Sequence, residues 1–413
     1  MRDHVDVAIV GAGAAGIAAA STLSGRSLDV VVLEARDRIG GRAWTIYPQN
    51  DLPLDAGCGW LHSADENVLA RLIEERGVAI DRTPPHWTRQ SGNRHFPPED
   101  QRAFQTAYAA FEARMAARAD TGLDAPGSDV FDPASPWNPL IDAVSAYYNG
   151  AEYDQVSVLD YAAYEDTEVN WRARDGYGAA IAALGRDLAH GPALVLDCPV
   201  SAIDHGAAPI RLTTARGVLT ARAVIVTVPT PLIAEARIAF TPPLPQKVEA
   251  AAGLPLGLAD KAFLHLATPD AVPVEGHLFG RTDRTQTGSY HLRPFGRPYV
   301  EAYLGGRHAR ELEHEGAGAM TAFALEELRG LMGSDFTATL SPIAETRWAK
   351  DSWALGSYSH ALPGHADARA ILAAPVDDRL FFAGEATHPR FYSTAHGAWE
   401  TGVRAAQAVV AAL

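Results

Sequence analysis

Residues 5–16 read VDVAIVGAGAAG, a short β-branched run that passes directly into a glycine-rich turn. The apolar run over residues 5–10 predicts a buried strand, because it is short and is closed by glycine. Gly11, Gly13 and Gly16 have the G-x-G-x-x-G spacing. The first glycine of this pattern allows a tight turn, the second lets a pyrophosphate approach the backbone, and the third lets helix and strand pack closely. The stretch therefore predicts a Rossmann-like unit that binds a dinucleotide.

The residues that follow extend this prediction. A helix is expected from Ala14 to about Gly25, and a second strand over residues 29–34, DVVVLE. The first turn of the helix, which includes Ala15, offers unpaired N–H groups to phosphates. Glu34 ends the second strand about twenty residues after the glycines, where a carboxylate accepts hydrogen bonds from ribose hydroxyls. These features alone do not separate a nicotinamide from a flavin dinucleotide.

Residues 34–45, EARDRIGGRAWT, favour a flavin. They carry Arg36, the pair Gly40 and Gly41, and Arg42. A nicotinamide enzyme has no need for this basic, glycine-rich extension, whereas the pyrophosphate and ribityl chain of FAD continue past the first helix. The alternative is that Arg36 and Arg42 are surface charges around a loop. The segment resembles the second fingerprint of the FAD-dependent amine oxidase superfamily.

Residues 54–62, LDAGCGWLH, resemble the loop of that family that passes the isoalloxazine ring. Its small residues, which leave room for a backbone against a flat ring, are Gly57, Cys58 and Gly59. By this resemblance Trp60 packs near the flavin. His62 corresponds to a histidine of the polyamine oxidase branch that lies near the substrate amine. A structural histidine is the alternative interpretation of His62.

Composition limits the classes of function. A chain of 413 residues favours two domains, and a formal net charge of −15 argues against nucleic acid as a partner. Such an acidic surface steers cationic substrates or simply keeps the protein soluble. No apolar run approaches the roughly 18 residues of a membrane span and no leader is recognised, so no membrane partner and a cytoplasmic location are expected. The two cysteines, Cys58 and Cys198, predict neither a disulfide framework nor a metal site.

The middle of the chain, residues 64–190, is mostly helical in pattern. Helices are expected within residues 65–77, opening with a capping Asp65, and within residues 98–120 and 176–189. This part contains no phosphate or metal motif and is expected to build much of a substrate domain.

An acidic run lies within the same part of the chain. It contains Glu165, Asp166 and Glu168. We interpret it as a solvated face, with recognition of a cationic amine as the alternative.

Strand patterns return in the second half. Residues 193–203 and 210–220 predict a hairpin with its turn at residues 215–217, and residues 222–229 predict another buried strand. This arrangement resembles the return of the chain to the FAD domain in the family, where the backbone of Val200 contacts the adenine.

Residues 257–266, GLADKAFLHL, place Lys261 in an apolar strand. A lysine is uncomfortable there unless something holds its charge. The family resemblance implies a role, since a lysine at this point hydrogen-bonds through water to the flavin N5. A lysine at a strand edge that reaches solvent is the alternative.

Residues 346–360, TRWAKDSWALGSYSH, resemble another element of the family. In monoamine oxidases the position of Ser357 is a cysteine that binds FAD covalently, so the serine here implies non-covalent FAD. Tyr358 then forms one wall of an aromatic cage in front of the flavin, which attracts and orients an amine.

Residues 380–398, LFFAGEATHPRFYSTAHGA, complete the resemblance. Gly384 and Glu385 match the pair whose carboxylate holds the ribityl chain. Ala395 begins a helix whose first amides point at the flavin and stabilise the negative charge of its reduced form. The second cage tyrosine of monoamine oxidases falls at Thr394, so the cage is expected to be open to a longer or bulkier amine.

The resemblance covers nearly the whole chain and implies an α/β fold of two parts. One part is a Rossmann-like FAD-binding domain built from residues 1–70, 192–258 and 372–413. The other is a discontinuous mixed α/β substrate-binding domain built from residues 71–191 and 259–371. The chain is expected to act alone or as a homodimer.

The implied function is a flavin-dependent amine oxidase with Lys261, His62 and Tyr358 as its catalytic residues. An amine would deliver a hydride equivalent from its α-carbon to FAD, water would hydrolyse the imine to an aldehyde or ketone, and O2 would be reduced to H2O2. No metal is required.

Other activities use the same FAD frame. They are an amine dehydrogenase with another electron acceptor, a desaturase, and an L-amino-acid oxidase. The last needs an arginine to bind carboxylate, for which Arg172, Arg174 and Arg293 are candidates. Outside enzymes, the alternative is a flavoprotein that binds a partner without turnover.

Overall fold

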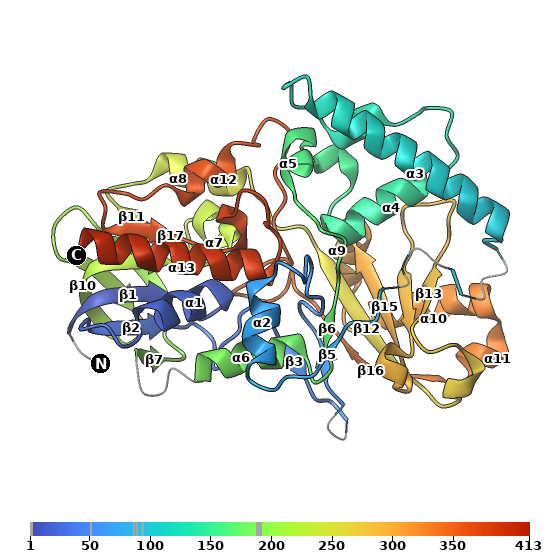
Figure 1. Cartoon of the computed structure of the whole chain (residues 1–413), viewed down its shortest axis with the longest axis horizontal. Helices are drawn as coiled ribbons and strands as arrows, with labels where there is room; N and C mark the ends of the chain where they lie inside the picture. Colours follow the sequence, from blue (N-terminus) through green and yellow to red (C-terminus); the bar gives the residue numbers. More distant parts are fainter. Residues whose placement is uncertain (1–2, 50–51, 86, 88–89, 92–94, 187–191) are drawn as a thin grey trace.

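The computed structural model describes residues 3–49, 52–85, 87, 90–91, 95–186 and 192–413. These residues form two halves that lie beside each other, each built around its own β-sheet (Figure 1). The first and last elements of the chain, in blue and red, lie in the same half. The α/β fold expected from the sequence is confirmed.

The first half contains an eight-stranded sheet within the described residues. Its strands are β1 (His4–Val10), β2 (Val30–Leu33), β7 (Ala193–Val195), β8 (Val200–Asp204), β9 (Ile210–Thr214), β10 (Gly217–Val226), β11 (Ala239–Thr241) and β17 (Leu380–Phe382). The order is β11-β8-β9-β10-β1-β2-β7, and β17 pairs with β10. Strands β10, β1, β2 and β7 run parallel, as do β10 and β17, which is the arrangement of a doubly wound nucleotide-binding sheet.

Helices cover both faces of this sheet. They are α1 (Ala14–Leu23), α2 (Val68–Glu74), α6 (Tyr177–Arg186), α7 (Thr230–Ala234), α8 (Pro245–Ala252), α12 (Ala368–Ala373) and α13 (Ala395–Ala412). Helices α1 and α13 pack along each other although they lie at opposite ends of the sequence (Figure 1). Small residues make this approach possible, since a Cβ on Gly402 of α13 would lie 2.1 Å from the carbonyl oxygen of Ala15.

The second half contains a five-stranded antiparallel sheet. Its strands are β12 (Ala259–Leu266), β13 (Gly276–Phe279), β14 (Ser289–Leu292), β15 (Tyr299–Gly305) and β16 (Leu340–Glu345), in the order β13-β14-β15-β12-β16. Its helices are α3 (Pro98–Ala119), α4 (Asn138–Tyr148), α5 (Val158–Ala163), α9 (Gly306–Glu315), α10 (Ala319–Met332) and α11 (Ser334–Thr337). A buried apolar cluster between the sheet and α9 and α10 forms the core of this half.

Smaller elements complete the fold. Two-stranded sheets pair β3 (Thr45–Ile46) with β4 (Leu54–Asp55) and β5 (Ile80–Asp81) with β6 (Arg172–Ala173). Short 3-10 helices are η1 (Gly127–Val130), η2 (Tyr153–Gln155), η4 (Pro269–Ala271), η5 (Pro294–Gly296) and η6 (Glu385–Thr387).

The hairpin predicted over residues 193–220 needs a correction. The turn at residues 215–217 is confirmed, because β9 and β10 meet there. The first arm, however, divides into β7, which pairs with β2, and β8, which pairs with β9. Strand β10 also continues unbroken to Val226, so the separate strand predicted over residues 222–229 is wrong. Pairing with β1 from Thr220 to Val226 keeps these residues in one strand with the hairpin arm.

The predicted helical pattern of residues 64–190 is confirmed by α2 to α6. The predicted cap at Asp65 is wrong, because α2 begins at Val68 and Asn67 caps it by accepting a hydrogen bond from the amide of Leu69. The predicted helix over residues 176–189 is α6, and its last three residues lie outside the described part of the chain.

The division of the chain into the two predicted domains stays a prediction. Helix α6 belongs by sequence to the predicted substrate domain, yet it shares a buried cluster with α1 and α2. In the described part of the chain, no helix has the length and apolar character that would let it cross a membrane.

Candidate active site

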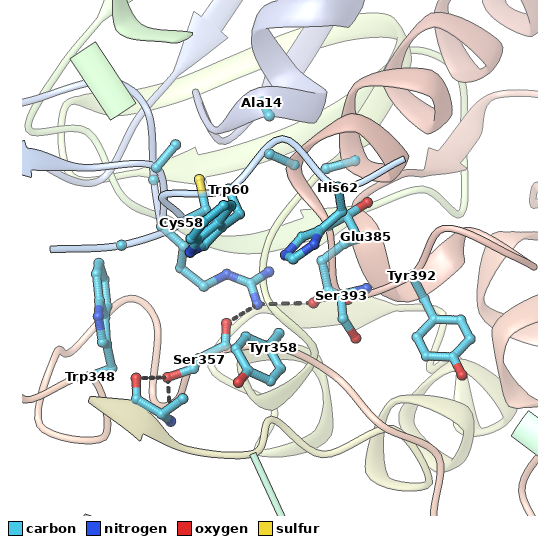
Figure 2. A pocket seen from close by; sticks show the side chains of 18 of the residues that line it. Ala14, Cys58, Trp60, His62, Trp348, Ser357, Tyr358, Glu385, Tyr392 and Ser393 are labelled. Carbon is cyan, nitrogen blue, oxygen red and sulfur yellow. Dashed lines mark hydrogen bonds and ion pairs between the residues drawn. The ribbon is translucent and has the colours of Figure 1, made fainter. Parts of the chain in front are cut away.

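A cavity of about 1200 Å³ is lined by residues from both halves of the molecule. It begins where β1 and β2 end, at Val10 and Leu33, and extends to residues of α3, α4 and the five-stranded sheet. The carboxyl ends of parallel strands are the usual place for a ligand in such a fold. Figure 2 shows a close view of its wall, to which Trp60 and His62 belong on one loop and Tyr358 on another.

The glycine turn forms part of the wall of this cavity. Gly11 has a φ of +106°, and a Cβ on it would lie 2.6 Å from Oγ1 of Thr227. A Cβ on Gly16 would lie 1.9 Å from the carbonyl oxygen of Gly11, so this position requires glycine for helix–strand packing. Gly13 stands at the N-cap of α1, and no side chain caps the helix. The first amides of α1 are therefore available to an anionic ligand.

The carboxylate of Glu34 is fixed beside this turn. It is 4% exposed, and it accepts hydrogen bonds from the amides of Ala12 (2.7 Å) and Arg36 (2.9 Å). The guanidinium of Arg36 donates to Asp351 at 2.6 Å. The surface-charge alternative for Arg36 is therefore wrong, since its side chain is only 12% exposed and is paired. Val200 lines the cavity nearby.

Arg42 and Glu385 form a partly buried ion pair that lines the cavity. The Nη1 of Arg42 lies 2.9 Å from Oε1 of Glu385 and also donates to the carbonyl oxygen of Ser357 (Figure 2). Ser359 Oγ and the amide of Ser393 donate to the other carboxylate oxygen at 2.6 Å and 2.9 Å. Burial raises the pKa of Glu385, but Arg42 and Ser359 outweigh it, so the pKa lies below its usual value. A surface role for Arg42 is excluded by this pairing.

The loop at residues 57–59 needs small residues for its own backbone packing, which the sequence did not reveal. A Cβ on Gly57 would lie 1.8 Å from the carbonyl oxygen of Arg42, so backbone packing alone requires glycine there. Gly59 faces Lys261, whose Nζ would lie 3.5 Å from an added Cβ. Burial raises the pKa of the Cys58 thiol to about 12, which keeps it protonated. Gly41 approaches Gly13 so closely that an added Cβ would lie 3.2 Å from the Cα of Gly13.

Lys261 lies on β12, inside the sheet between β15 and β16. The alternative of a strand-edge lysine that reaches solvent is therefore wrong, as its side chain is 8% exposed. Its Nζ donates to the carbonyl oxygen of Asp55 at 2.9 Å and lies 3.1 Å from Oε1 of Glu301. Burial lowers the pKa of Lys261, but the charges of Glu301 and its neighbours outweigh this effect and raise it.

His62 lies in the cavity wall with one ring nitrogen already occupied. Its Nδ1 is 2.6 Å from Oδ1 of Asn170. Burial lowers the pKa of His62, which favours the neutral ring. The neutral ring can therefore donate to Asn170 and offer its second nitrogen as an acceptor.

Tyr358 and Thr394, the two positions of the predicted cage, both line the cavity. The Tyr358 hydroxyl lies 2.9 Å from that of Tyr303 and donates to the carbonyl oxygen of Tyr147. Thr394 is the N-cap of α13, and its Oγ1 accepts from the amide of Gly397 at 3.0 Å. The threonine thus has a structural function at the start of this helix.

Tyrosines and carboxylates also line this cavity. The tyrosines include Tyr108, Tyr147, Tyr148, Tyr161, Tyr164, Tyr303 and Tyr392. The carboxylates include Glu112, Asp166 and Glu168, besides Glu34, Glu275, Glu301 and Glu385. All three acids of the run are exposed, as a solvated face requires. Asp166 and Glu168 also line the cavity, so the alternative of amine recognition stays open, and Glu165 pairs with Arg390.

The three arginines considered for carboxylate binding lie elsewhere. Arg172 is buried against Trp60 and Phe295 and pairs with Glu275 at 2.8 Å. Arg174 and Arg293 are engaged with other partners, and none of the three lines the described cavity. This arrangement disfavours an amino-acid oxidase.

The structure brings the predicted residues together around one cavity. The lining includes Gly11, Gly13, Ala15, Glu34, Arg36, Gly41, Arg42, Gly57, Cys58, Gly59, Trp60, His62, Val200, Lys261, Tyr358, Gly384, Glu385, Thr394 and Ala395. Gly16 lies behind the turn. Their individual roles stay predictions.

Sequence reasoning missed Glu301 and Tyr303. Both lie on β15 and line the cavity. The alternation of apolar and polar residues in YVEAYLG is a signal for this shared face, although it does not identify the neighbouring strand.

Comparison with known proteins identifies the family. Residues 14–410 match the family described as flavin containing amine oxidoreductase. The chain belongs to this family. It is therefore an oxidoreductase that uses FAD and acts on a small amine.

Among the curated relatives of this amine oxidoreductase are two plant enzymes and a human one. Polyamine oxidase 2 of Arabidopsis thaliana is 29% identical, over 97% of this chain and 87% of its own length. Polyamine oxidase 4 of Oryza sativa has the same identity and coverage. Lysine-specific histone demethylase 2 of Homo sapiens is 25% identical over 98% of this chain and 53% of its own length.

Solved structures support the fold. A single-substitution variant of putrescine oxidase, made to redesign its cofactor binding, superposes with a TM-score of 0.80 at 21% sequence identity, covering 99% of both chains. The wild-type putrescine oxidase bound to putrescine has a TM-score of 0.77 at 20% identity, with the same coverage.

The residues of the cavity fit FAD. The uncapped amides of α1 suit a pyrophosphate, and the buried carboxylate of Glu34 suits ribose hydroxyls. Ser357 takes the place of the cysteine that a covalent link would require, and its Oγ donates to the carbonyl oxygen of Ala259. The site therefore suits non-covalent FAD.

Proposed function

We propose that this protein oxidises the C–N bond of an amine that carries a second positive charge. The products would be an imine, which water hydrolyses to an aldehyde or ketone, and H2O2 formed from O2. Bound FAD supplies the two-electron acceptor. The observation that carries the proposal is one cavity that joins residues fitting FAD to a lining of tyrosines and of Glu112, Asp166 and Glu168.

The aromatic walls would bind and orient the substrate. Tyr358 and Tyr303 are joined through their hydroxyls, so the two rings hold each other in place. Burial raises the pKa of both phenols, which keeps them neutral and able to donate. Neutral rings in a sheltered cavity favour the uncharged form of the reacting amine, because burial penalises the ammonium.

The two polar residues near the small-residue loop would have separate tasks. Lys261 presents a held ammonium close to Gly59, suited to positioning a water molecule. His62, neutral and hydrogen-bonded to Asn170, offers an acceptor for an amine N–H. The first amides of α13, at Ala395, would stabilise negative charge at the adjacent end of the ring system.

Asp166 and Glu168 would select the substrate class. Asp166 and Glu168 are exposed at the cavity wall and have no basic side chain within ion-pair distance in the described residues. A distal ammonium can neutralise them at contact distance, whereas an uncharged tail cannot. The relatives named polyamine oxidase support this assignment.

Anaerobic bleaching of the flavin tests the proposal without reference to the final electron acceptor. Purified protein loaded with FAD is mixed with a diamine, a triamine and an alkyl monoamine of equal length. We expect the diamine or triamine to bleach the flavin at lower concentration than the monoamine. The double substitution Asp166→Asn and Glu168→Gln should remove this preference, while Glu326→Gln on the exposed face of α10 should not.

Two results would contradict the proposal. Bleaching by none of the amines would reject amine oxidation for the compounds tried, and equal bleaching by monoamine and diamine would reject the second charge. Peroxide release in air then separates an oxidase from a dehydrogenase.

The rate of flavin reduction should increase with pH. The reacting nitrogen must lose its proton before hydride transfer, and free alkyl ammonium groups deprotonate near the pKa of lysine, roughly 10.4. The measurement is a stopped-flow rate of anaerobic bleaching from neutral to alkaline pH. A flat profile, with chemistry shown to limit the rate, would contradict this expectation.

A further inference from the structure

The ammonium of Lys261 has three N–H groups, and two of them have acceptors in the protein. One acceptor is the carbonyl oxygen of Asp55 at 2.9 Å, and the other is Oε1 of Glu301 at 3.1 Å. No third protein acceptor is seen in the part of the chain that the structure describes. The third N–H is thus left for a ligand in the cavity that Lys261 lines.

Strand register places Glu301 beside Lys261. Strands β12 and β15 are antiparallel neighbours, and Lys261 lies opposite Tyr303. Glu301 is two residues from Tyr303 and so projects from the same face of the sheet. Both charged side chains are sheltered, at 8% exposed for Lys261 and 18% for Glu301, so bulk salt screens their attraction only weakly.

The Asp55 acceptor is held in place by its own side chain. The Asp55 carboxylate accepts from Oγ1 of Thr45 at 2.6 Å and from the amides of Tyr177 and Gly178 at 2.9 Å and 3.1 Å. These bonds connect β3, β4 and the start of α6. The backbone of Asp55 is therefore a rigid acceptor, and Glu301 is the flexible side chain that completes the arrangement.

The charge of Lys261 depends on the groups that face it. In the described residues these are Glu301 and Tyr303 from β15, Asp55 from β4 and the Cys58 thiol from the following loop. Burial lowers the pKa of Lys261, and Glu301 is the largest of the contributions that raise it again. Tyr303 and Cys58 are themselves protonated, because burial raises the pKa of each.

We propose that Glu301 is a positioning residue that holds Lys261 as an ammonium with one N–H directed to a ligand in the cavity. It acts through Lys261 and need not touch the reacting amine. This inference rests on the proposed role of Lys261 in the oxidase.

The first test measures the titration of Lys261 itself. The chain contains only three lysines, Lys247, Lys261 and Lys350, so lysine labelled with carbon-13 at Cε gives three assignable signals. Lys261→Met identifies the signal of interest. In Glu301→Gln this signal should titrate at lower pH than in the wild type, while Glu326→Gln should leave it unchanged. An unchanged Lys261 titration in Glu301→Gln would overturn the proposal.

The second test measures reoxidation of chemically reduced flavin. Dithionite reduces the bound FAD, and mixing with O2 then passes two electrons and two protons to dioxygen as H2O2 forms. Glu301→Gln should slow this step about tenfold to a hundredfold, the range expected for a misplaced group at a reacting centre. The loss should grow as pH rises, because burial then favours neutral Lys261.

Controls separate positioning from a general structural effect. Glu301→Asp retains the charge and should restore most of the rate and titration, whereas Lys261→Met should be slow at every pH. If Glu301→Gln does not fold, Glu301→Asp serves as the test. Its Lys261 signal should titrate at slightly lower pH than in the wild type. Wild-type reoxidation in Lys261→Met would also overturn the proposal. Neither test uses an amine. The results can therefore be interpreted even if the proposed substrate is wrong.

Discussion

At the residue scale, Glu385 is the most connected carboxylate of the FAD end. It joins Arg42, Ser359 and Ser393, which come from three separate parts of the chain. The predicted contact with the ribityl chain would add to these bonds. The residue therefore has a structural task even before any cofactor is considered.

Glu385→Gln should lower the stability of the protein by about 2 kcal/mol at neutral pH, because Arg42 would lose a charged partner. Since the pKa of Glu385 is lowered in the folded state, its contribution is fully present above the unfolded value of about 4.5 and is lost as pH falls below it. The difference from wild type should therefore shrink in acid. Urea denaturation at pH 4 and pH 7 measures it, with Glu326→Gln as the control. A difference that grows in acid would contradict this reasoning.

At the element scale, Thr394 has two possible functions, one in the cavity wall and one at the start of helix α13. The sequence presented Thr394 as a missing cage tyrosine, and the structure shows its hydroxyl bonded to Gly397 at the N-cap. The helix cap is observed, and the open cage stays a prediction that the small size of threonine allows.

Thr394→Val should cost about 1 kcal/mol of stability, the usual value of a helix N-cap. It should also weaken FAD binding, because the capped turn lines the cavity. Thermal unfolding of the apoprotein and a flavin titration measure the two effects. Thr394→Ser keeps the hydroxyl and should resemble the wild type; equal losses in both variants would exclude the cap as the cause.

The C-terminal end of α12 is capped by a lysine side chain, which donates to carbonyl oxygens there. Lys247 is 5% exposed, and its Nζ donates to the carbonyl oxygens of Ile371 (2.6 Å), Leu372 (3.0 Å) and Ala374. Lys247→Met should therefore destabilise the protein by about 2 kcal/mol, because buried carbonyls lose their donor. Lys350→Met, at an exposed position, is the matched control and should be neutral in urea denaturation. Equal midpoints for the two variants would contradict the capping role.

At the scale of the whole molecule, a pair of buried acids lies inside the second half. Asp260 is fully buried and Glu313 is 2% exposed, and one carboxyl oxygen of each has no hydrogen-bond donor among the described groups. Burial, with a hydrogen bond to Glu313, raises the pKa of Asp260 well above its usual value. A shared proton satisfies both oxygens.

This pair should make stability fall as pH rises. The folded state binds the proton more tightly than the unfolded state, so the free energy of unfolding decreases from about pH 4 up to the raised pKa of Asp260. Asp260→Asn keeps an acceptor for Thr346 and supplies an N–H to Glu313, and it should flatten this dependence. Urea midpoints at pH 5, 7 and 9 measure the slope. A variant as pH-sensitive as the wild type would contradict the shared proton.

The sequence alone determined the features that depend on neighbours along the chain. The strand, glycine turn and helix of residues 5–23 could be predicted because a tight turn and a close helix contact need glycine at set spacings. The likeness of further short segments extended this to the family and its cofactor.

Only the tertiary structure decided which distant side chains meet. Glu385 meets Arg42 across 343 positions, Glu301 meets Lys261 through strand register, and Asp166 lines the cavity. Backbone preferences act over a few residues, whereas such pairs depend on how sheets and helices pack. The cofactor is therefore indicated by local patterns, while the positions of the charges, on which the proposed substrate depends, follow from the fold.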